Sequence, residues 1–337
     1  MDENETREST VFSAAYDPAE LLLLRTKNDI RRMGIVVGLP MVLLMLGMIY
    51  TQTLIVRVAV ALGYREEIVS LLGKLPGSEA VSVVISSLYF VGLFTLFCRL
   101  SGNKVGRVTA FGRPKAGVTL PLLCIGVGVC TFANLGAAQL EQYFSWFPFS
   151  YHWSYDNGSS TGFFAVALAL ISSAVVPALV EEFACRGVVF GLLEKYGQDF
   201  AVVTTAVLFG MMHGNFSQIP FAVTVGFVLG FVRAKSGSVW PAVALHFINN
   251  AISCLLSTLA KLTSNAAAGT AQTVYFLLSL LLTAVGVVWL ELRDKGAWRL
   301  TPFGEISFGK RCGWFFSSPM VIIFLLIAVG EACYFFF

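Results

Sequence analysis

Long apolar runs are the feature of this sequence that most constrains its fold. A helix needs roughly 20 mostly apolar residues to cross the hydrocarbon core of a membrane. Runs that reach or approach this length cover residues 33–56, 80–98, 117–139, 161–181, 198–213, 218–233, 238–260, 272–292 and 314–337. A backbone inside a bilayer must satisfy its own hydrogen bonds, which a helix does within one segment. The sequence therefore predicts an all-α fold: a polytopic transmembrane helical bundle of about eight or nine spans.

Composition agrees with a membrane protein. The chain is 56% hydrophobic and 13% charged, whereas soluble domains are roughly 25% charged. The net charge of +3 is too weak to indicate nucleic acid as a partner. The seven cysteines form no CxxC pair and behave as small hydrophobic residues.

The basic residues predict the orientation. Lys and Arg are enriched in cytoplasmic loops of membrane proteins, and here they gather before the first run and in the segment 99–115. The N-terminus is therefore predicted to lie in the cytoplasm. Nine spans would place the C-terminus outside, and one span fewer would return it to the cytoplasm.

The apolar runs and the polar residues that interrupt them suggest four parts of the chain. These are a cytoplasmic N-terminal segment (1–32), N-terminal transmembrane helices and loops (33–159), a helical core that contains the polar interruptions (160–260) and C-terminal transmembrane helices (261–337).

Three polar clusters interrupt apolar runs within residues 160–260. Ionisable groups inside membrane helices are costly to bury and usually mark function, so we expect the clusters to meet in one buried site. Their members are Glu181, Glu182 and Arg186 in the first, His213 in the second, and His246 and Asn250 in the third.

Helical spacing suggests how these side chains divide their tasks. Glu182 and Arg186 are four residues apart and share a helix face, so they can pair. Glu181 points roughly 100° away from Glu182 and is left free to face a cavity. His246 and Asn250 also share a face. They could donate hydrogen bonds to a developing oxyanion, or contribute to a metal site with a carboxylate.

Taken together and in this order, the clusters resemble a known family. Its pattern is EExxxR, then FxxxH, then HxxxN or HxxxD, each on its own membrane helix. This chain has Glu181-Glu182-Phe-Ala-Cys-Arg186, Phe209-Gly-Met-Met-His213 and His246-Phe-Ile-Asn-Asn250. The pattern is similar to that of the CPBP family of intramembrane proteases, also called the Abi or CAAX-protease family, which includes the type II CAAX prenyl endopeptidase. The resemblance covers roughly residues 160–260.

The resemblance implies a helical membrane fold with a catalytic cavity open toward the cytoplasmic side. It further implies that Glu181 activates the attacking water, that His213 helps to position this water, and that His246 and Asn250 stabilise the oxyanion. The motif residues with supporting roles would be Glu182, Arg186 and Phe209.

The resemblance leaves the cofactor open. Glu181, His213 and His246 are the residue types that hold zinc, and many family members are labelled metalloproteases. A metal would lower the pKa of its bound water to roughly 7. In the alternative, metal-free mechanism, the same side chains bind the water directly and the carboxylate acts as the base.

The sequence therefore predicts an integral membrane endopeptidase, multi-pass and located in a bacterial cell membrane. Its partners would be membrane lipids and a peptide or protein substrate, such as a prenylated protein or a leader peptide. Two other functions compete with this hypothesis. A proton-coupled transporter also places Glu and His in membrane helices, but predicts a polar path on both sides of the membrane. A non-catalytic scaffold or immunity protein would have no need of all the polar residues.

Overall fold

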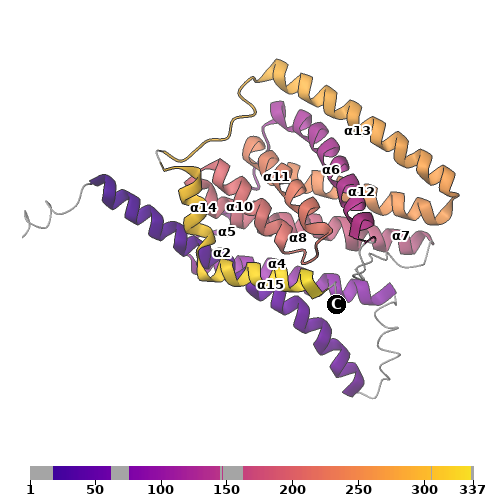
Figure 1. The fold of residues 1–337 in the computed structure, drawn as a ribbon, viewed down its shortest axis with the longest axis horizontal. Helices are drawn as coiled ribbons and strands as arrows, with labels where there is room; N and C mark the ends of the chain where they lie inside the picture. Colours follow the sequence, from indigo (N-terminus) through magenta and orange to yellow (C-terminus); the bar gives the residue numbers. More distant parts are fainter. Residues whose placement is uncertain (1–17, 62–75, 145, 147–161, 305, 335–337) are drawn as a thin grey trace, which may run out of the picture.

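The computed structural model describes residues 18–61, 76–144, 146, 162–304 and 306–334. Within these ranges the regular structure is helical and contains no strand (Figure 1), which confirms the all-α prediction. The longer helices are α2 (Pro18–Ala61), α4 (Pro76–Leu100), α6 (Ala116–Phe144), α10 (Gln198–Met211), α11 (Gln218–Ser236), α12 (Trp240–Leu262), α13 (Asn265–Arg293) and α15 (Pro319–Tyr334). Two short helices are α5 (Val105–Val108) and α14 (Phe308–Phe316).

The described residues hold seven helices that are long and apolar enough to cross a membrane. An eighth span results if α14 and α15, which meet at 76°, form one broken crossing. Helix α10 has only 14 residues, so it rises about 21 Å, less than the roughly 30 Å of the hydrocarbon core. The protein is therefore a multi-pass membrane protein, and the run predicted at 198–213 is too short to be a full crossing by itself.

The first helix begins earlier than the apolar run predicted. Helix α2 starts at Pro18 and continues without a break to Ala61, so part of the predicted N-terminal segment belongs to the first membrane helix. No glycine or proline occurs between residues 19 and 33, and the residues there are mostly good helix formers despite their charge. Residues 1–17 lie outside the described part of the chain.

The helix that carries the first polar cluster runs for 34 residues, from Phe163 to Tyr196, rather than ending at 181 as predicted. Glu and Arg are good helix formers, so the loss of apolar character at the cluster does not end the helix. The helix changes its winding twice, into π turns, which occur most often at functional sites. Its consecutive segments are α7 (Phe163–Leu170), η1 (Ile171–Val175), α8 (Val176–Glu182), η2 (Phe183–Val189), α9 (Phe190–Leu193) and η3 (Glu194–Tyr196).

Glycines allow α10 and α11 to pack with their backbones close together. A Cβ atom on Gly210 would lie 2.9 Å from the backbone nitrogen of Val223. On the facing helix, a Cβ atom on Gly226 would lie 3.1 Å from Cα of Ala206. Small residues permit this close approach in membrane helices. The short turn that joins the two helices carries His213, which the tight packing holds in place.

A buried arginine attaches the bent C-terminal pair to the start of α10. The guanidinium of Arg311 is almost fully buried and donates two hydrogen bonds of 2.8 Å to the two carboxylate oxygens of Asp199. It also donates to the backbone carbonyl of Tyr196 at 2.7 Å. Such two-pronged contacts fix orientation as well as distance, so α14 lies against α10 (Figure 1).

Candidate active site

The three polar clusters border one cavity of about 430 Å³. Glu181 reaches it from α8, His213 from the turn after α10, and His246 and Asn250 from α12. They come from three separate parts of the sequence, and packing of three helical segments brings them together. The remaining two members of the clusters, Glu182 and Arg186, are fully buried behind the cavity wall.

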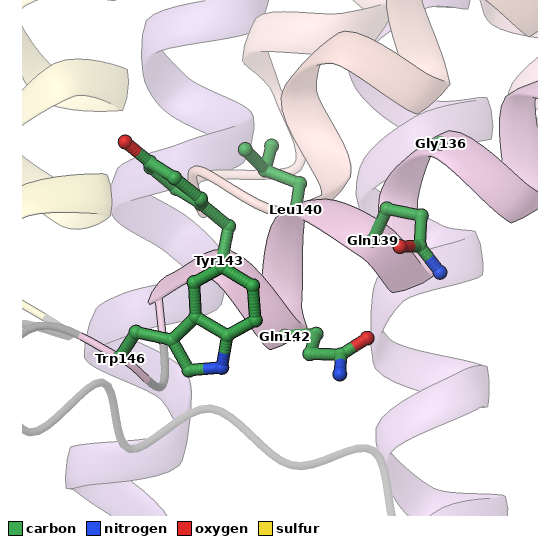
Figure 2. A pocket seen from close by; sticks show the side chains of 6 residues that line it. All are labelled: Gly136, Gln139, Leu140, Gln142, Tyr143 and Trp146. Atoms are coloured by element: carbon green, nitrogen blue, oxygen red, sulfur yellow. The ribbon is translucent and has the colours of Figure 1, made fainter.

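A second hollow of about 380 Å³ lies near the end of α6. Figure 2 shows the side chains that line it, which are Gly136, Gln139, Leu140, Gln142, Tyr143 and Trp146. No ionisable group other than a tyrosine lines this hollow, and it holds none of the predicted site residues. The cavity between the polar clusters is therefore the candidate active site.

Glu182 connects two of the clusters. Its Oε1 accepts a hydrogen bond from Nη1 of Arg186 at 2.7 Å, the pairing that the four-residue spacing predicted. The same oxygen accepts a bond of 2.9 Å from Nδ1 of His246 on α12. Because a carboxylate only accepts hydrogen bonds, Nδ1 of His246 carries a proton. The other ring nitrogen, Nε2, is therefore the one available on the cavity side.

Arg186 is held by more than its carboxylate partner. Its second terminal nitrogen, Nη2, donates to the backbone carbonyl of Gly226 at 2.9 Å. The guanidinium carbon also lies 4.3 Å from the centre of the Phe209 ring, at the distance of a cation–π contact. The arginine thus joins the first cluster to α10 and α11.

Phe209 lies where the three clusters meet. Its ring centre is 5.1 Å from that of His213 and 5.8 Å from that of His246, with edge-to-face geometry in both pairs. Nδ1 of His213 lies 2.8 Å from the backbone carbonyl of Phe209. A carbonyl accepts, so Nδ1 carries the proton and Nε2 has a free lone pair. The four-residue spacing of Phe209 and His213 accounts for their contact, whereas the contacts of Phe209 with the other clusters cross between helices.

Asn250 is oriented by residues that the motifs did not include. Its Nδ2 donates to the backbone carbonyl of Ser173 at 3.0 Å. Its Oδ1 accepts from Nδ2 of Asn249 at 3.0 Å, and Oδ1 of Asn249 accepts from Nδ2 of Asn134 at 3.0 Å. Asn134, Ser173 and Asn249 also line the cavity. A lone Asn in the apolar run 117–139 was the signal available in the sequence.

Glu181 differs from the other charged members of the clusters. Its carboxylate lines the cavity and has no hydrogen bond or ion pair with any residue in the described ranges. Its neighbour Glu182 points away from the cavity and is bonded to two partners. The arrangement leaves Glu181 free to interact with a molecule inside the cavity.

Glu181, His213 and His246 are not arranged as the ligands of a metal ion. Zinc sites in enzymes use three protein ligands at about 2.0–2.3 Å. Among the residues that the structure describes, no group of three His, Cys, Asp or Glu side chains is close enough to hold an ion. Glu181, His213 and His246 border one cavity without converging on one point. The groups that the cavity offers to a substrate are therefore the side chains themselves.

Comparisons with known proteins match the part of the chain that contains all three clusters. Residues 163–252 match the family model described as type II CAAX prenyl endopeptidase Rce1-like. The resemblance to this endopeptidase family is thereby confirmed. The Bacillus subtilis (strain 168) protein named "Putative membrane peptidase YdiL" is 31% identical over 87 residues. That alignment covers 26% of this chain and 36% of the relative. No solved structure matches the chain.

The Rce1-like segment does not contain the whole cavity. It begins at the start of α7 and ends within α12, so helix α6 and its residue Asn134 lie outside it. The motif positions that define the family resemblance are inside the segment, whereas part of the surroundings of Asn250 is supplied from elsewhere in the chain.

Proposed function

We propose that this protein is an intramembrane endopeptidase that hydrolyses a peptide bond by means of a water molecule activated by Glu181. The observation that carries the proposal is the single cavity shared by Glu181, His213, His246 and Asn250. The match to an endopeptidase family and the similarity to a membrane peptidase support the same reaction class.

The first step is proton removal from water. A general base must be ionised and within about 3 Å of the water it activates. The Glu181 carboxylate lines the cavity and forms no hydrogen bond or ion pair with a described residue, so it can bind such a water. Nε2 of His213 has a free lone pair and can accept a hydrogen bond from the same water, which fixes its direction of attack. The water oxygen then bonds to the carbonyl carbon, and the electrons of the carbonyl double bond move to its oxygen.

The oxyanion that forms requires hydrogen-bond donors. Asn250 has a second N–H on Nδ2 besides the one bonded to Ser173. His246 can donate from Nε2 when that nitrogen carries a proton, while Nδ1 keeps its bond to the Glu182 carboxylate. Glu181 then returns the proton to the leaving amine, directly or by way of Nε2 of His213, as the carbon–nitrogen bond breaks.

The site would be electrically balanced in this state. Two carboxylates, Glu181 and Glu182, would face two cations, Arg186 and His246. An isolated charge is expensive to bury, and paired charges are much less so. Loss of the water proton to Glu181 and formation of the oxyanion move charge within the site without changing its total.

The proposed substrate is a peptide bond close to the cytoplasmic boundary of the membrane, in a membrane-associated peptide that includes lipidated forms. We place the N-terminus in the cytoplasm on the distribution of basic residues, and the relative from Bacillus subtilis supports a bacterial cell membrane as its location. Labelling of single cysteines introduced into the 99–115 segment, with a reagent that does not cross membranes, tests this orientation.

Cleavage of a peptide library by the purified protein in detergent tests the function. The comparison is between the wild type, Glu181→Gln and Glu141→Gln, a matched removal of an exposed carboxylate on α6. We expect cleavage by the wild type and the control and at least a 10²-fold loss in Glu181→Gln, as for loss of a general base. If Glu182→Gln abolishes cleavage while Glu181→Gln does not, the two carboxylates have exchanged roles.

Chelation decides the cofactor in the same assay. Activity that disappears with a chelator and returns with zinc would establish a metalloprotease. Activity that is indifferent to chelators would establish the metal-free mechanism. Cleavage that persists in both Glu181→Gln and Glu182→Gln would refute the proposed function.

A further inference from the structure

Three asparagines form a hydrogen-bonded row along one wall of the cavity. Nδ2 of Asn134 donates to the backbone carbonyl of Cys130 at 2.9 Å and to Oδ1 of Asn249 at 3.0 Å. Asn249 donates in turn to Oδ1 of Asn250, whose own Nδ2 donates to the carbonyl of Ser173. Each amide in the row therefore passes its orientation to the next.

The two ends of the row fix the direction of every amide. A backbone carbonyl only accepts hydrogen bonds, so Asn134 must turn its NH₂ group toward Cys130, and Asn250 must turn its NH₂ group toward Ser173. With Asn134 in this orientation, its second N–H faces Oδ1 of Asn249, which leaves the NH₂ group of Asn249 for Asn250. Any single flipped amide would place two donors or two acceptors against each other.

We infer that Asn134, acting through Asn249, is a positioning residue that holds the Asn250 amide with a free N–H directed into the cavity. This inference rests on the proposed function, in which that N–H stabilises the oxyanion. The side chain of Asn250 could rotate and offer its oxygen instead, which would repel an oxyanion. The row of hydrogen bonds prevents this rotation. Its first residue, Asn134, lies on α6, a helix that carries none of the motif residues and is outside the Rce1-like segment.

A hydrogen-bond donor that is oriented before the substrate binds would explain why three asparagines line a cavity in an apolar helix bundle. Donors that are already oriented stabilise a transition state without reorganising during the reaction. A buried polar network specifies one arrangement only if its members are satisfied. Here the row uses both N–H groups of Asn134 and the acceptor oxygens of Asn249 and Asn250, and one N–H of Asn250 is left for the substrate.

A double-mutant cycle on activity tests the inference. The variants are Asn134→Leu, Asn250→Ala and the two combined, assayed on an internally quenched peptide that the wild type cleaves. We expect Asn134→Leu to lower kcat about tenfold with KM unchanged, less than the roughly 10²–10³-fold cost of losing an oxyanion donor outright. In the Asn250→Ala background the same substitution should have no further effect, because the amide it orients is gone.

The matched control is Thr131→Val, one helical turn away on α6. The Thr131 hydroxyl contacts Tyr275 and its own helix, and it does not line the cavity. This variant should keep the wild-type kcat. A raised KM in Asn134→Leu would assign Asn134 to substrate binding and overturn the positioning role, as would an equal loss of kcat in the presence and absence of the Asn250 side chain.

A second cycle uses no substrate. Asn134 and Asn250 share no direct hydrogen bond, so their effects on thermal unfolding in detergent should add unless Asn249 links them. We expect the double variant Asn134→Leu/Asn250→Leu to lose less than the sum of the single losses, since either substitution breaks the row. If the wild type cleaves no peptide, the proposed function has failed and this cycle alone decides the row. Strictly additive losses of thermal stability in this cycle would overturn the inference that Asn134 and Asn250 are linked.

Discussion

Arg186 offers the sharpest test of how the site is held together. It is fully buried within a helix that crosses the membrane, and it contacts three different helical segments. Its partners are the carboxylate of Glu182, the backbone carbonyl of Gly226 and the ring of Phe209. Replacement of Arg186 by Met keeps much of the volume and removes the charge and both hydrogen bonds.

The expected loss can be worked from these contacts. Removing one partner of a buried ion pair costs about 3–5 kcal/mol, because the other charge stays buried without a partner. Glu182 would still have the His246 bond, which favours the lower end of that range. The unmade bond to the Gly226 carbonyl adds a desolvation penalty of about 1–3 kcal/mol. We expect a total near 4 kcal/mol, a large part of the roughly 5–15 kcal/mol that stabilises a typical domain.

Thermal unfolding of the purified protein in detergent measures this loss. At roughly 2–4 °C per kcal/mol, the melting temperature should fall by about 8–16 °C. Arg113→Met, which removes an exposed cation before α6, is the matched control and should change it little. The double variant Glu182→Leu/Arg186→Met should recover part of the loss because no charge is stranded. A folded, fully active Arg186→Met protein with an unchanged melting temperature would refute the pairing.

Three further substitutions test neighbouring contacts. Glu182→Gln should lower kcat by about 10² or more, because His246 loses the carboxylate that fixes its tautomer and orientation; wild-type kcat in folded protein would contradict this. Phe209→Leu removes a cation–π contact and two ring contacts, so the free energy of unfolding should fall by about 1–2 kcal/mol, and no change would show that the ring is dispensable. Gly226→Ala should destabilise the protein by about 1–3 kcal/mol through crowding between α10 and α11. Gly92→Ala on α4, which meets nothing within 4 Å, should be neutral or stabilising; equal melting temperatures for these two alanine variants would contradict the close packing.

The apolar runs predicted the class of fold because a membrane leaves few alternatives. Hydropathy reports where a segment is apolar, and not where a helix begins or ends. Helix α2 therefore starts at Pro18 among charged residues, and the helix that begins at Phe163 continues through its polar cluster to Tyr196. The break between α14 and α15 falls at Ser317-Ser318-Pro319, where the residue before a proline is disfavoured in a helix, but no pattern in the sequence gives its angle of 76°.

The pairing of Glu182 with Arg186 was predictable because it lies within one helix. Spacing along a helix states which residues share a face, and it does not state which other helix that face meets. For this reason the bond from His246 to Glu182 and the central position of Phe209 required the structure. The contact between Asn134 and Asn249 could not be predicted for the same reason, since the two residues are 115 positions apart in the sequence.

The distribution of partners in the site explains why one carboxylate can act as a base. Burying an ionised group in a membrane is costly, and the protein offsets this cost for Glu182 with Arg186 and His246. Glu181, one residue away on another face of the same helix, has no such partner in the described ranges. Oε1 of Glu182 is already engaged by both partners, and Glu182 does not line the cavity, so it is not placed to take a proton from a water there. The unpartnered carboxylate at the cavity can gain and release a proton without breaking the framework that holds the donors in place. It follows that the framework and the base must be different residues. Adding a cation to the cavity that Glu181 lines, for example by Ser172→Lys, should therefore suppress cleavage while leaving Glu182, Arg186 and the fold intact.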